Sequence, residues 1–242
     1  MLALDLDPQG QLAKVLGIDP RSVRRSAIDL LLDEVLDEHS LDRRSADQGV
    51  LPITPTRIPG LDLVVGTKAL GLYPAVETMD GGERSSGRLG AALAAARELQ
   101  AYDLVMMDAP PYFGPLTLNV LRAASEVVIP VPLTYLALDG CAELLRTIET
   151  VRHRYGNPEL RVSMVIPTFY RRTRMAHELL ERLKARFPKE IAHTVLGYHV
   201  KIDEAQSRGL SVVEYAPGDR ASRAMGALAE ELELRAPPAE DR

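Results

Sequence analysis

Short apolar runs alternate with amphipathic stretches along most of the chain. Continuous apolar runs predict strands at residues 2–6, 50–54, 61–66, 103–108, 126–131, 160–168 and 194–197. Apolar positions at helical spacing predict helices at residues 12–18, 26–36, 87–100, 115–124, 137–155, 175–187 and 222–235. Strands without polar alternation are buried on both faces, so this alternation predicts an α/β fold with a mostly parallel, doubly wound sheet and helices on both faces. We expect the runs at 103–108 and 160–166 to share that sheet.

Composition narrows the class of protein. Hydrophobic residues make up 46% of the chain and charged residues 26%, which is enough apolar material for a sizeable core. We expect one domain over residues 1–235 and a disordered polar tail at 236–242. Cys141 is the sole cysteine, so no intrachain disulfide can form and a reducing compartment is indicated. No basic leader precedes an apolar stretch and no apolar run reaches about 18 residues, so we expect a cytoplasmic protein with no membrane partner.

Charge is distributed unevenly along the sequence. Residues 1–150 carry 13 basic and 21 acidic side chains, whereas residues 151–242 carry 16 basic and 13 acidic ones. This asymmetry permits a nucleic-acid surface on the last third of the chain. It does not require one, because solvated helix faces are the commoner explanation of such a balance.

Two predicted strands end in carboxylates. Asp5 and Asp7 are two residues apart, so they share a face at the end of the first strand, which Pro8 stops. Asp108 follows the apolar run LVMM, which is the pattern of a Walker B strand, where the acid holds Mg²⁺ or its waters beside a nucleotide phosphate. Alone this pattern is weak, because many strand-end acids only cap the next helix.

The combination of segments is more specific than any one of them. Five segments follow one another across residues 3–235. They are DLDPQG at 5–10, GIDP at 17–20, the stretch 107–140 that begins MDAPPYFG, RRTRMAHELLE at 171–181 and DEAQSRGLSVVEYAPGDRAS at 203–222. In this order they resemble boxes of the ParA/Soj family of deviant Walker-type P-loop ATPases, within the MinD/ParA superfamily.

The resemblance implies ATP and Mg²⁺ as cofactors and a role for each matching residue. Asp7 resembles the catalytic residue that acts through the attacking water, and Asp5 and Asp108 resemble the residues near Mg²⁺, mainly through its waters. Pro110, Pro111 and Gly114 fall in what would be the switch II loop, which responds to the γ-phosphate. Plain loop geometry also explains the prolines, and a capping role also explains Asp5.

The resemblance also implies partners. It predicts an ATP-dependent homodimer, nonspecific DNA, a ParB-like centromere-binding or other activating partner, and a location on the nucleoid. The residues that match the family's DNA-binding face are Arg171, Arg172, Arg174, Lys201, Arg208 and Arg220.

The sequence departs from the family in two places. The family opens with a strand and a KGGxGKTT phosphate loop, but this sequence holds no GKT or GKS, so we expect the chain as given to be inactive and a sheet edge to be exposed. Gly197, Tyr198 and His199 replace the Pro-Arg-Asn that flanks adenine in the family, so the mode of base recognition stays open.

Two alternative functions stay open at this point. One is a non-catalytic ParA-like interaction protein that cannot bind ATP because the phosphate loop is missing. The other is a MinD-like positioning ATPase, which ends in a basic amphipathic helix that lies on the bilayer. The acidic endings EELELR and APPAEDR disfavour the MinD-like alternative.

Overall fold

The computed structural model describes residues 1–32, 34–36, 43–45, 50–75 and 85–235. The chain forms two compact units, Met1–Ala124 and Ser125–Arg242, and each is described by itself. The tail expected at 236–242 lies outside the described residues. The single domain expected over 1–235 stays a prediction. Within the described part of the chain, no helix has the length and apolar character that a membrane crossing needs.

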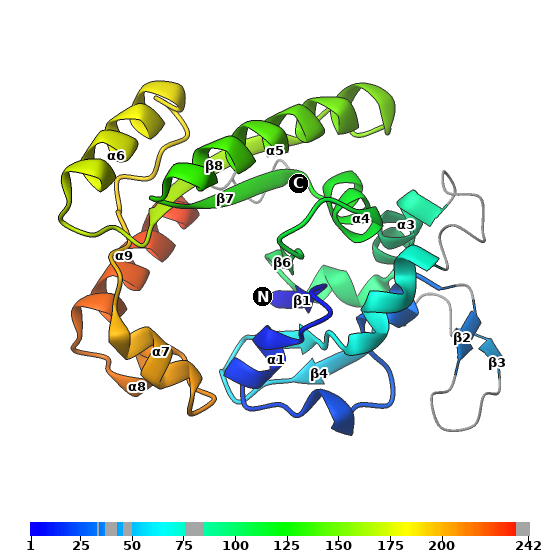
Figure 1. The fold of residues 1–242 in the computed structure, drawn as a ribbon. Helices are drawn as coiled ribbons and strands as arrows, with labels where there is room; N and C mark the ends of the chain where they lie inside the picture. The colour runs from blue at the N-terminus through cyan, green and yellow to red at the C-terminus, as the bar shows by residue number, and fades with distance from the viewer. Residues whose placement is uncertain (33, 37–42, 46–49, 76–84, 236–242) are drawn as a thin grey trace. The chain divides into compact units, whose positions relative to one another are not determined.

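The first unit is built on a four-stranded sheet with the order β4-β5-β1-β6 (Figure 1). β1 (Leu2–Asp5) pairs in parallel with β5 (Asp62–Val64) on one side and with β6 (Val105–Asp108) on the other. β4 (Ile53–Pro55) runs antiparallel to β5 at one edge. β1 and β5 are therefore the two inner strands of this sheet, and all four residues of β1 are buried.

The remaining elements of this unit are short. β2 (Glu34–Leu36) and β3 (Arg43–Ser45) form a separate antiparallel pair. The helical elements are α1 (Gln11–Val15), η1 (Pro20–Ser22), η2 (Ala27–Leu30), η3 (Lys68–Leu72), η4 (Ser85–Gly87), α3 (Arg88–Ala95), η5 (Arg97–Ala101) and α4 (Pro115–Ala123).

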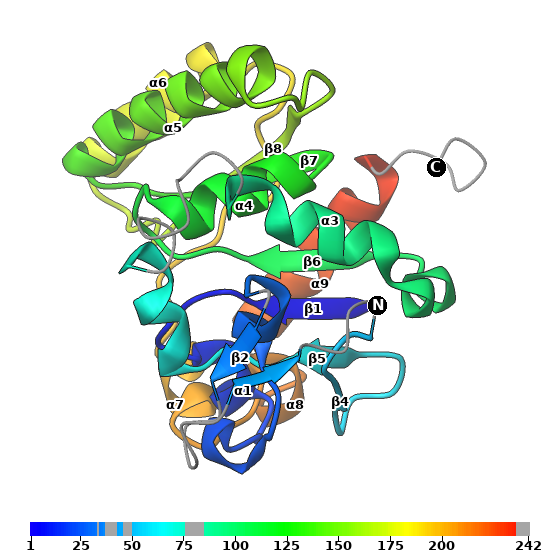
Figure 2. The ribbon, with the colours of Figure 1, turned by 90° about the vertical axis from the view of Figure 1, so that its right-hand side faces the viewer.

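Helices cover both faces of the sheet, as predicted (Figure 2). Successive side chains of a strand point to opposite faces, so Leu2 and Leu4 of β1 lie on one face and Ala3 lies on the other. The leucine face packs against α3 and α4 through Leu89 and Leu116. The Ala3 face packs against α1 through apolar residues that include Ala13 and Leu16. Both sides of β1 are thereby removed from water.

A buried asparagine joins α4 to its neighbours. The Asn119 side chain accepts a hydrogen bond from the backbone N–H of Leu89 at 3.2 Å and donates to the Tyr73 hydroxyl at 3.1 Å. It also donates to the Pro115 carbonyl at 3.0 Å. Because an unpaired buried amide is costly, this network fixes how α3 and α4 lie against each other.

The second unit begins with a βαβ segment. β7 (Glu126–Pro132) and β8 (Arg161–Thr168) are parallel and are joined by α5 (Tyr135–Arg154). The other helices of this unit are α6 (Arg174–Arg186), α7 (Val200–Gln206), α8 (Val212–Tyr215) and α9 (Arg220–Arg235). α5 and α6 lie over one face of the two strands and α9 over the other (Figures 1 and 2).

The end of α9 is fastened to the segment that follows α6. Leu228 and Leu232 pack against Met164 and Ile166 of β8. One turn farther along, the Arg235 guanidinium donates to the backbone carbonyls of residues 190 and 191 at 2.8 and 2.7 Å and pairs with the carboxylate of residue 231 at 2.7 Å. The helix is thus held to its unit by polar as well as apolar contacts.

The structure corrects two local predictions. The helix predicted at 26–36 is wrong, because Ala27–Leu30 forms only a short 3-10 turn and Glu34–Leu36 is β2. A capping box between Ser26 and Asp29 and a hydrogen bond from the Ala27 N–H to the Val65 carbonyl, at 2.8 Å, fix this turn against the sheet. The strand predicted at 194–197 is also wrong, since this stretch makes only an isolated bridge at Gly197.

The expectation that 103–108 and 160–166 share one sheet is wrong as well. β6 belongs to the four-stranded sheet, whereas β8 pairs with β7 in a separate two-stranded sheet. Among the described strands, none pairs with the second edge of β6 or of β7. β6 is the last strand in the order of its sheet, and its Met106 side chain is 42% exposed. The exposed sheet edge expected from the sequence stays a prediction.

We expect the Met106→Lys variant to aggregate more slowly than the parent protein as concentration rises. A lysine on an unpaired edge opposes edge-to-edge strand pairing. Because Met106 is exposed, the free energy of unfolding should change by less than about 1 kcal/mol. Light scattering against concentration and urea unfolding measure the two effects. The control is Leu234→Lys, which adds the same charge on the exposed side of α9, away from any strand. If this variant slows aggregation as much as Met106→Lys does, the effect does not come from the strand edge.

Candidate functional site

Two neighbouring strands carry the predicted carboxylates to one edge of the first unit's sheet. β1 and β6 are in register with Asp5 directly opposite Asp108. The backbone N–H of Leu6 donates to the Asp108 carbonyl at 2.9 Å, which continues the ladder past Asp5. Asp7 lies close enough to interact electrostatically with both carboxyl groups. The three acids thus lie at one edge of the sheet, and their convergence within one cleft stays a prediction.

The Asp5 carboxyl is completely buried, yet its hydrogen bonds are long. It accepts from the backbone N–H of Asp7 at 3.3 Å and from that of Ala13, in α1, at 3.4 Å. No described basic side chain makes an ion pair with it. The carboxylate is therefore removed from water without a strong compensating partner, which is an unfavourable environment for a negative charge.

Two glycines make this burial possible, and the sequence interpretation missed both roles. A Cβ at Gly66 would lie 2.5 Å from the Asp5 carbonyl oxygen and 2.7 Å from its carboxyl carbon. Gly10 has φ of +57°, and a Cβ there would lie 2.8 Å from the Gly66 carbonyl oxygen. The available signal was positional, because Gly66 directly ends an apolar run and Gly10 ends the DLDPQG segment.

Asp5 and Asp108 bind protons more tightly than free aspartates do. Burial raises the pKa of Asp5 from 3.8 to about 6, opposed by the hydrogen bond from Ala13 and assisted by the charge of Asp108. Desolvation, followed by the charge of Asp7, raises the pKa of Asp108. An excess of negative charge at a strand edge favours a bound proton or a bound cation.

Asp7 begins a tight turn rather than extending the strand. Its carboxylate accepts from the backbone N–H of Gln9 at 2.9 Å, and its carbonyl accepts from that of Gly10 at 3.0 Å. The side chain is only half-buried. One carboxylate oxygen is thus engaged by the turn, and the other is available to a water molecule or a ligand.

The loop after β6 is fixed at its α4 end. Gly114 caps α4, Pro115 occupies the first helical position, and the Thr117 hydroxyl donates to the Tyr112 carbonyl at 2.6 Å. Pro110 is buried, whereas Pro111 is exposed. The Tyr112 and Phe113 side chains at the tip are exposed, so the loop combines a fixed base with an open tip.

The carboxylates of Asp5 and Asp108 suit a metal ion that keeps most of its water molecules better than one that is bound directly by several side chains. Among the described residues, no group of three or more His, Cys, Asp or Glu side chains could hold a metal ion directly. Mg²⁺ usually keeps several waters and takes one or two carboxylates from the protein. Asp5 and Asp108 provide two adjacent carboxylates, so the chain fits a cation that is held mainly through water.

All six predicted DNA-contacting side chains belong to the second unit and are exposed; they are Arg171, Arg172, Arg174, Lys201, Arg208 and Arg220. Part of their charge is compensated, since Arg174 pairs with Glu178 at 2.9 Å and Lys201 pairs with Glu204 at 2.7 Å. Lys201 and Arg208 each also lie over the Tyr215 ring, at 5.6 and 4.8 Å from its centre. The structure thus groups two of the predicted cations around one aromatic side chain.

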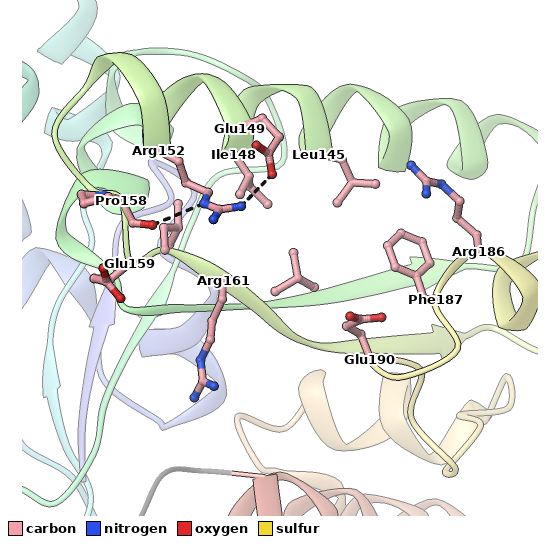
Figure 3. Close-up of a pocket in the computed structure, with 12 residues that line it drawn as sticks. Leu145, Ile148, Glu149, Arg152, Pro158, Glu159, Arg161, Arg186, Phe187 and Glu190 are labelled. Carbon is pink, nitrogen blue, oxygen red and sulfur yellow. Dashed lines mark hydrogen bonds and ion pairs between the residues drawn. The ribbon is translucent and has the colours of Figure 1, made fainter. Parts of the chain in front are cut away.

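The second unit also contains a pocket of about 570 Å³ between α5 and β8 (Figure 3). Ile148, Leu160 and Phe187 give it apolar walls. At its rim Arg152 donates to the Glu149 carboxylate at 2.9 Å and to the Pro158 carbonyl at 3.4 Å, so this charge is already used within the protein. None of the predicted site residues lines the pocket.

We expect Asp5→Asn to stabilise the protein near neutral pH and not at pH 4. A carboxyl whose pKa is raised on folding binds more protons in the folded state, so stability falls as pH rises from about 4 to about 6. The shift from 3.8 to about 6 corresponds to about 3 kcal/mol at most.

Urea unfolding in magnesium-free buffer at pH 4 and pH 7.5 measures this difference. Glu230→Gln, an acid-to-amide change on the exposed side of α9, is the matched control and should be neutral at both pH values. A destabilised Asp5→Asn protein at pH 7.5 would show that the buried charge is not the dominant cost.

Comparisons with known proteins identify the family to which the chain is similar. The family model described as an AAA domain matches residues 1–162. The chromosome-partitioning ATPase Soj of Thermus thermophilus is 37% identical over 238 residues, which are 97% of this chain and 84% of that protein. The sporulation initiation inhibitor protein Soj of Bacillus subtilis is 32% identical over 239 residues, which are 96% of this chain and 85% of that protein.

Solved structures of similar proteins have the same fold. Cobyrinic acid a,c-diamide synthase from Mycobacterium smegmatis, with bound ADP and magnesium, has a TM-score of 0.71 and 27% identity over 96% of this chain and 80% of that one. An ATP complex of McdA from Cyanothece has a TM-score of 0.74 at 17% identity, over 96% and 84% of the two chains, which is a likeness of fold alone. These neighbours confirm the predicted fold class. The chain belongs to the ParA/Soj family of P-loop ATPases, within the MinD/ParA superfamily.

Proposed function

We propose that this protein is a ParA-type ATPase that acts as a nucleotide-dependent switch in chromosome or plasmid partitioning. The observation that carries the proposal is the position of Asp5 beside Asp108 with Asp7 on the following turn, in a chain of the ParA/Soj family. In parallel α/β sheets, ligands bind at the carboxyl ends of the strands, which is where these acids lie.

Each acid has a distinct part in the proposed site. Asp5 and Asp108 would hold a Mg²⁺ ion through its water molecules, and the ion would supply positive charge beside the phosphates of ATP. Asp7 keeps one oxygen in the turn with Gln9 and directs the other to the attacking water. The loop with Pro110, Pro111 and Gly114 responds to the γ-phosphate from its fixed α4 end.

The switch acts on DNA. ATP binding joins two copies of the chain, and the dimer binds DNA without sequence preference through arginine and lysine side chains of the second unit, which places the protein on the nucleoid. A ParB-like centromere-binding or other activating partner triggers hydrolysis, which separates the dimer. Support for the DNA contact comes from the exposure of all six predicted cations.

We expect Asp7→Ala to separate DNA binding from ATP turnover. In P-loop ATPases the charge of the phosphates is met by backbone amides of the phosphate loop, by its lysine and by Mg²⁺, and none of these needs Asp7. Residues 1–242 alone should release no phosphate above background, so the comparison is made in protein with a KGGxGKTT segment placed ahead of the chain. There Asp7→Ala should lower turnover by roughly 100-fold or more while DNA affinity persists or rises.

Phosphate release and DNA binding with ATP are measured on the same samples. Asp19→Ala, which removes an exposed acid from the same unit, serves as the control and should retain turnover. Loss of DNA affinity together with turnover in Asp7→Ala would contradict the assigned role.

We expect the triple change of Arg171, Arg172 and Arg174 to alanine to reduce the salt dependence of duplex DNA binding and to leave ATPase activity largely intact. Each phosphate contact that is lost lowers the slope of log affinity against log salt by about 0.9. The slope should therefore fall by roughly 2 to 3.

Fluorescence anisotropy of a labelled duplex across a salt series measures the slope. Arg146, Arg154 and Lys189, exposed cations elsewhere in the same unit, changed together to alanine give the control. If the protein with its phosphate loop shows no DNA affinity at low salt with ATP, partitioning through DNA is the wrong function.

A further inference from the structure

The pocket between α5 and β8 continues into a second hollow along α5. The first has a volume of about 570 Å³ and the second about 360 Å³. Leu145, Glu149 and Arg186 line both, so the two hollows form one elongated groove in the second unit. Small-molecule sites in proteins commonly have volumes of about 300–1,000 Å³, and this groove has a size of that order.

The larger hollow has apolar walls. Ile148 of α5, Leu160 directly before β8 and Phe187 directly after α6 line it, and each is nearly fully buried within the protein. Figure 3 shows the Leu145 side chain and the Phe187 ring beside the space between α5 and β8. An apolar chain placed against these walls would leave water, which is favourable. The groove therefore suits a ligand with an apolar part.

Two of the arginines that line the groove are already paired within the protein. Arg152 pairs with the Glu149 carboxylate at 2.9 Å, and Arg161 pairs with the Glu126 carboxylate. Figure 3 shows the Arg161 side chain directed away from α5. The other oxygen of Glu149 lies 3.3 Å from the His153 imidazole. These groups have little charge left for a ligand.

Arg146 and Arg186 are different. Both are exposed and line the second hollow, and neither makes an ion pair with an acid of the described residues. The Arg186 side chain extends from the end of α6 toward α5, and its guanidinium lies 5.7 Å from the centre of the Phe187 ring (Figure 3). Burial raises the pKa of Cys141 in α5, and the charge of Arg186 opposes this rise, as its closeness to α5 requires. Two uncompensated guanidinium groups thus lie beside the apolar walls.

The acids of the groove determine where a charged group fits. Glu159 and Glu190 also lack an ion pair with a cation of the described residues, but they line only the larger hollow. Figure 3 shows Glu159 at the end of the groove opposite Arg186. The second hollow has Glu149 as its acid, and that carboxylate is already engaged. The groove therefore favours an anion in the second hollow and disfavours one elsewhere.

We propose that this groove binds a small amphiphile with a carboxylate head group on an apolar chain. The carboxylate accepts hydrogen bonds from the guanidinium groups of Arg146 and Arg186, whose N–H groups match carboxylate oxygens in pairs. The chain passes over Leu145 and lies against Ile148 and Phe187 in the larger hollow. A few placed charges beside apolar walls are the usual composition of a small-molecule site.

The site is separate from the groups assigned to partitioning. It lies at the amino end of β8 and at the last turn of α6, whereas the predicted DNA contacts Arg171, Arg172 and Arg174 follow β8 and begin α6. Binding in the groove is thus a further property of the second unit. It needs no nucleotide, so the chain of residues 1–242 is itself the material for the test.

Isothermal titration calorimetry with decanoate, kept below the concentration at which it forms micelles, measures the binding. We expect one saturable site. Hexanoate and octanoate give the dependence on chain length, and each added methylene should tighten binding by roughly two- to fourfold. Decyltrimethylammonium has the same chain with the opposite charge and should bind roughly 10-fold more weakly than decanoate, or less.

Variants of the exposed side chains separate recognition of the head group from a structural role. Arg186→Ala should weaken decanoate binding by roughly 10- to 100-fold, and Arg186→Lys should restore part of this loss. Glu190→Gln removes an acid from the groove and should leave binding unchanged or tighter. Arg182→Ala, an exposed cation of α6 that does not line the groove, is the matched control and should bind as the parent does. Urea unfolding checks that each variant keeps its fold.

Four outcomes would overturn the proposal. They are absence of decanoate binding, affinity independent of chain length, equal binding of decyltrimethylammonium, and unchanged affinity in Arg186→Ala. Sedimentation of the chain with phosphatidylglycerol vesicles, lost in Arg186→Ala, would assign these cations to a lipid surface and would overturn the groove as well. None of these results bears on partitioning, which is judged by duplex binding with ATP.

Discussion

The burial of one carboxyl group governs the architecture of the first unit. Asp5 has neighbours on both sides because β1 lies between β5 and β6, and it is closed off by Gly66 and by the first turns that follow the strand. Glycine at both 10 and 66 is required because any side chain there would meet backbone or carboxyl atoms. The sheet therefore brings an acid into a dry position and leaves Asp7 and Asp108 to face the solvent side of the same edge.

Such an arrangement is costly for the stability of the folded state. A buried carboxyl with two long hydrogen bonds and no cation is poorer for folding than an apolar residue of similar size. Strained or underpartnered groups that persist in a well-packed environment are commonly kept for binding or chemistry. The burial of Asp5 is thus consistent with the binding role proposed for it.

Sequence reasoning predicted the features that depend on local pattern. Apolar runs located β1, β6, β7 and β8, and the acids at the ends of the first two strands were expected to meet because parallel strands share a carboxyl edge. Features that depend on distant contacts were not predictable. The 26–36 stretch has a helical pattern, but the Val65 carbonyl and the Ser26–Asp29 box draw it into a short turn. The close contact of Gly66 with Asp5 and the positive φ of Phe169 likewise depend on residues that are neighbours only in the folded structure.

The anchoring of α9 by Arg235 has a consequence for local motion. Helices near the end of a chain usually fray, because their last carbonyls have few partners and opening them costs little. Here Arg235 bonds to carbonyls of residues 190 and 191, and Glu231 accepts the N–H groups of His193 and Thr194 at 2.8 and 3.1 Å. Unwinding the final turn would strip partners from a segment that itself bridges to β8 at Ile191. We therefore expect the last turn of α9 to open together with this segment, so that its amide hydrogens exchange more slowly than those of a frayed helix end.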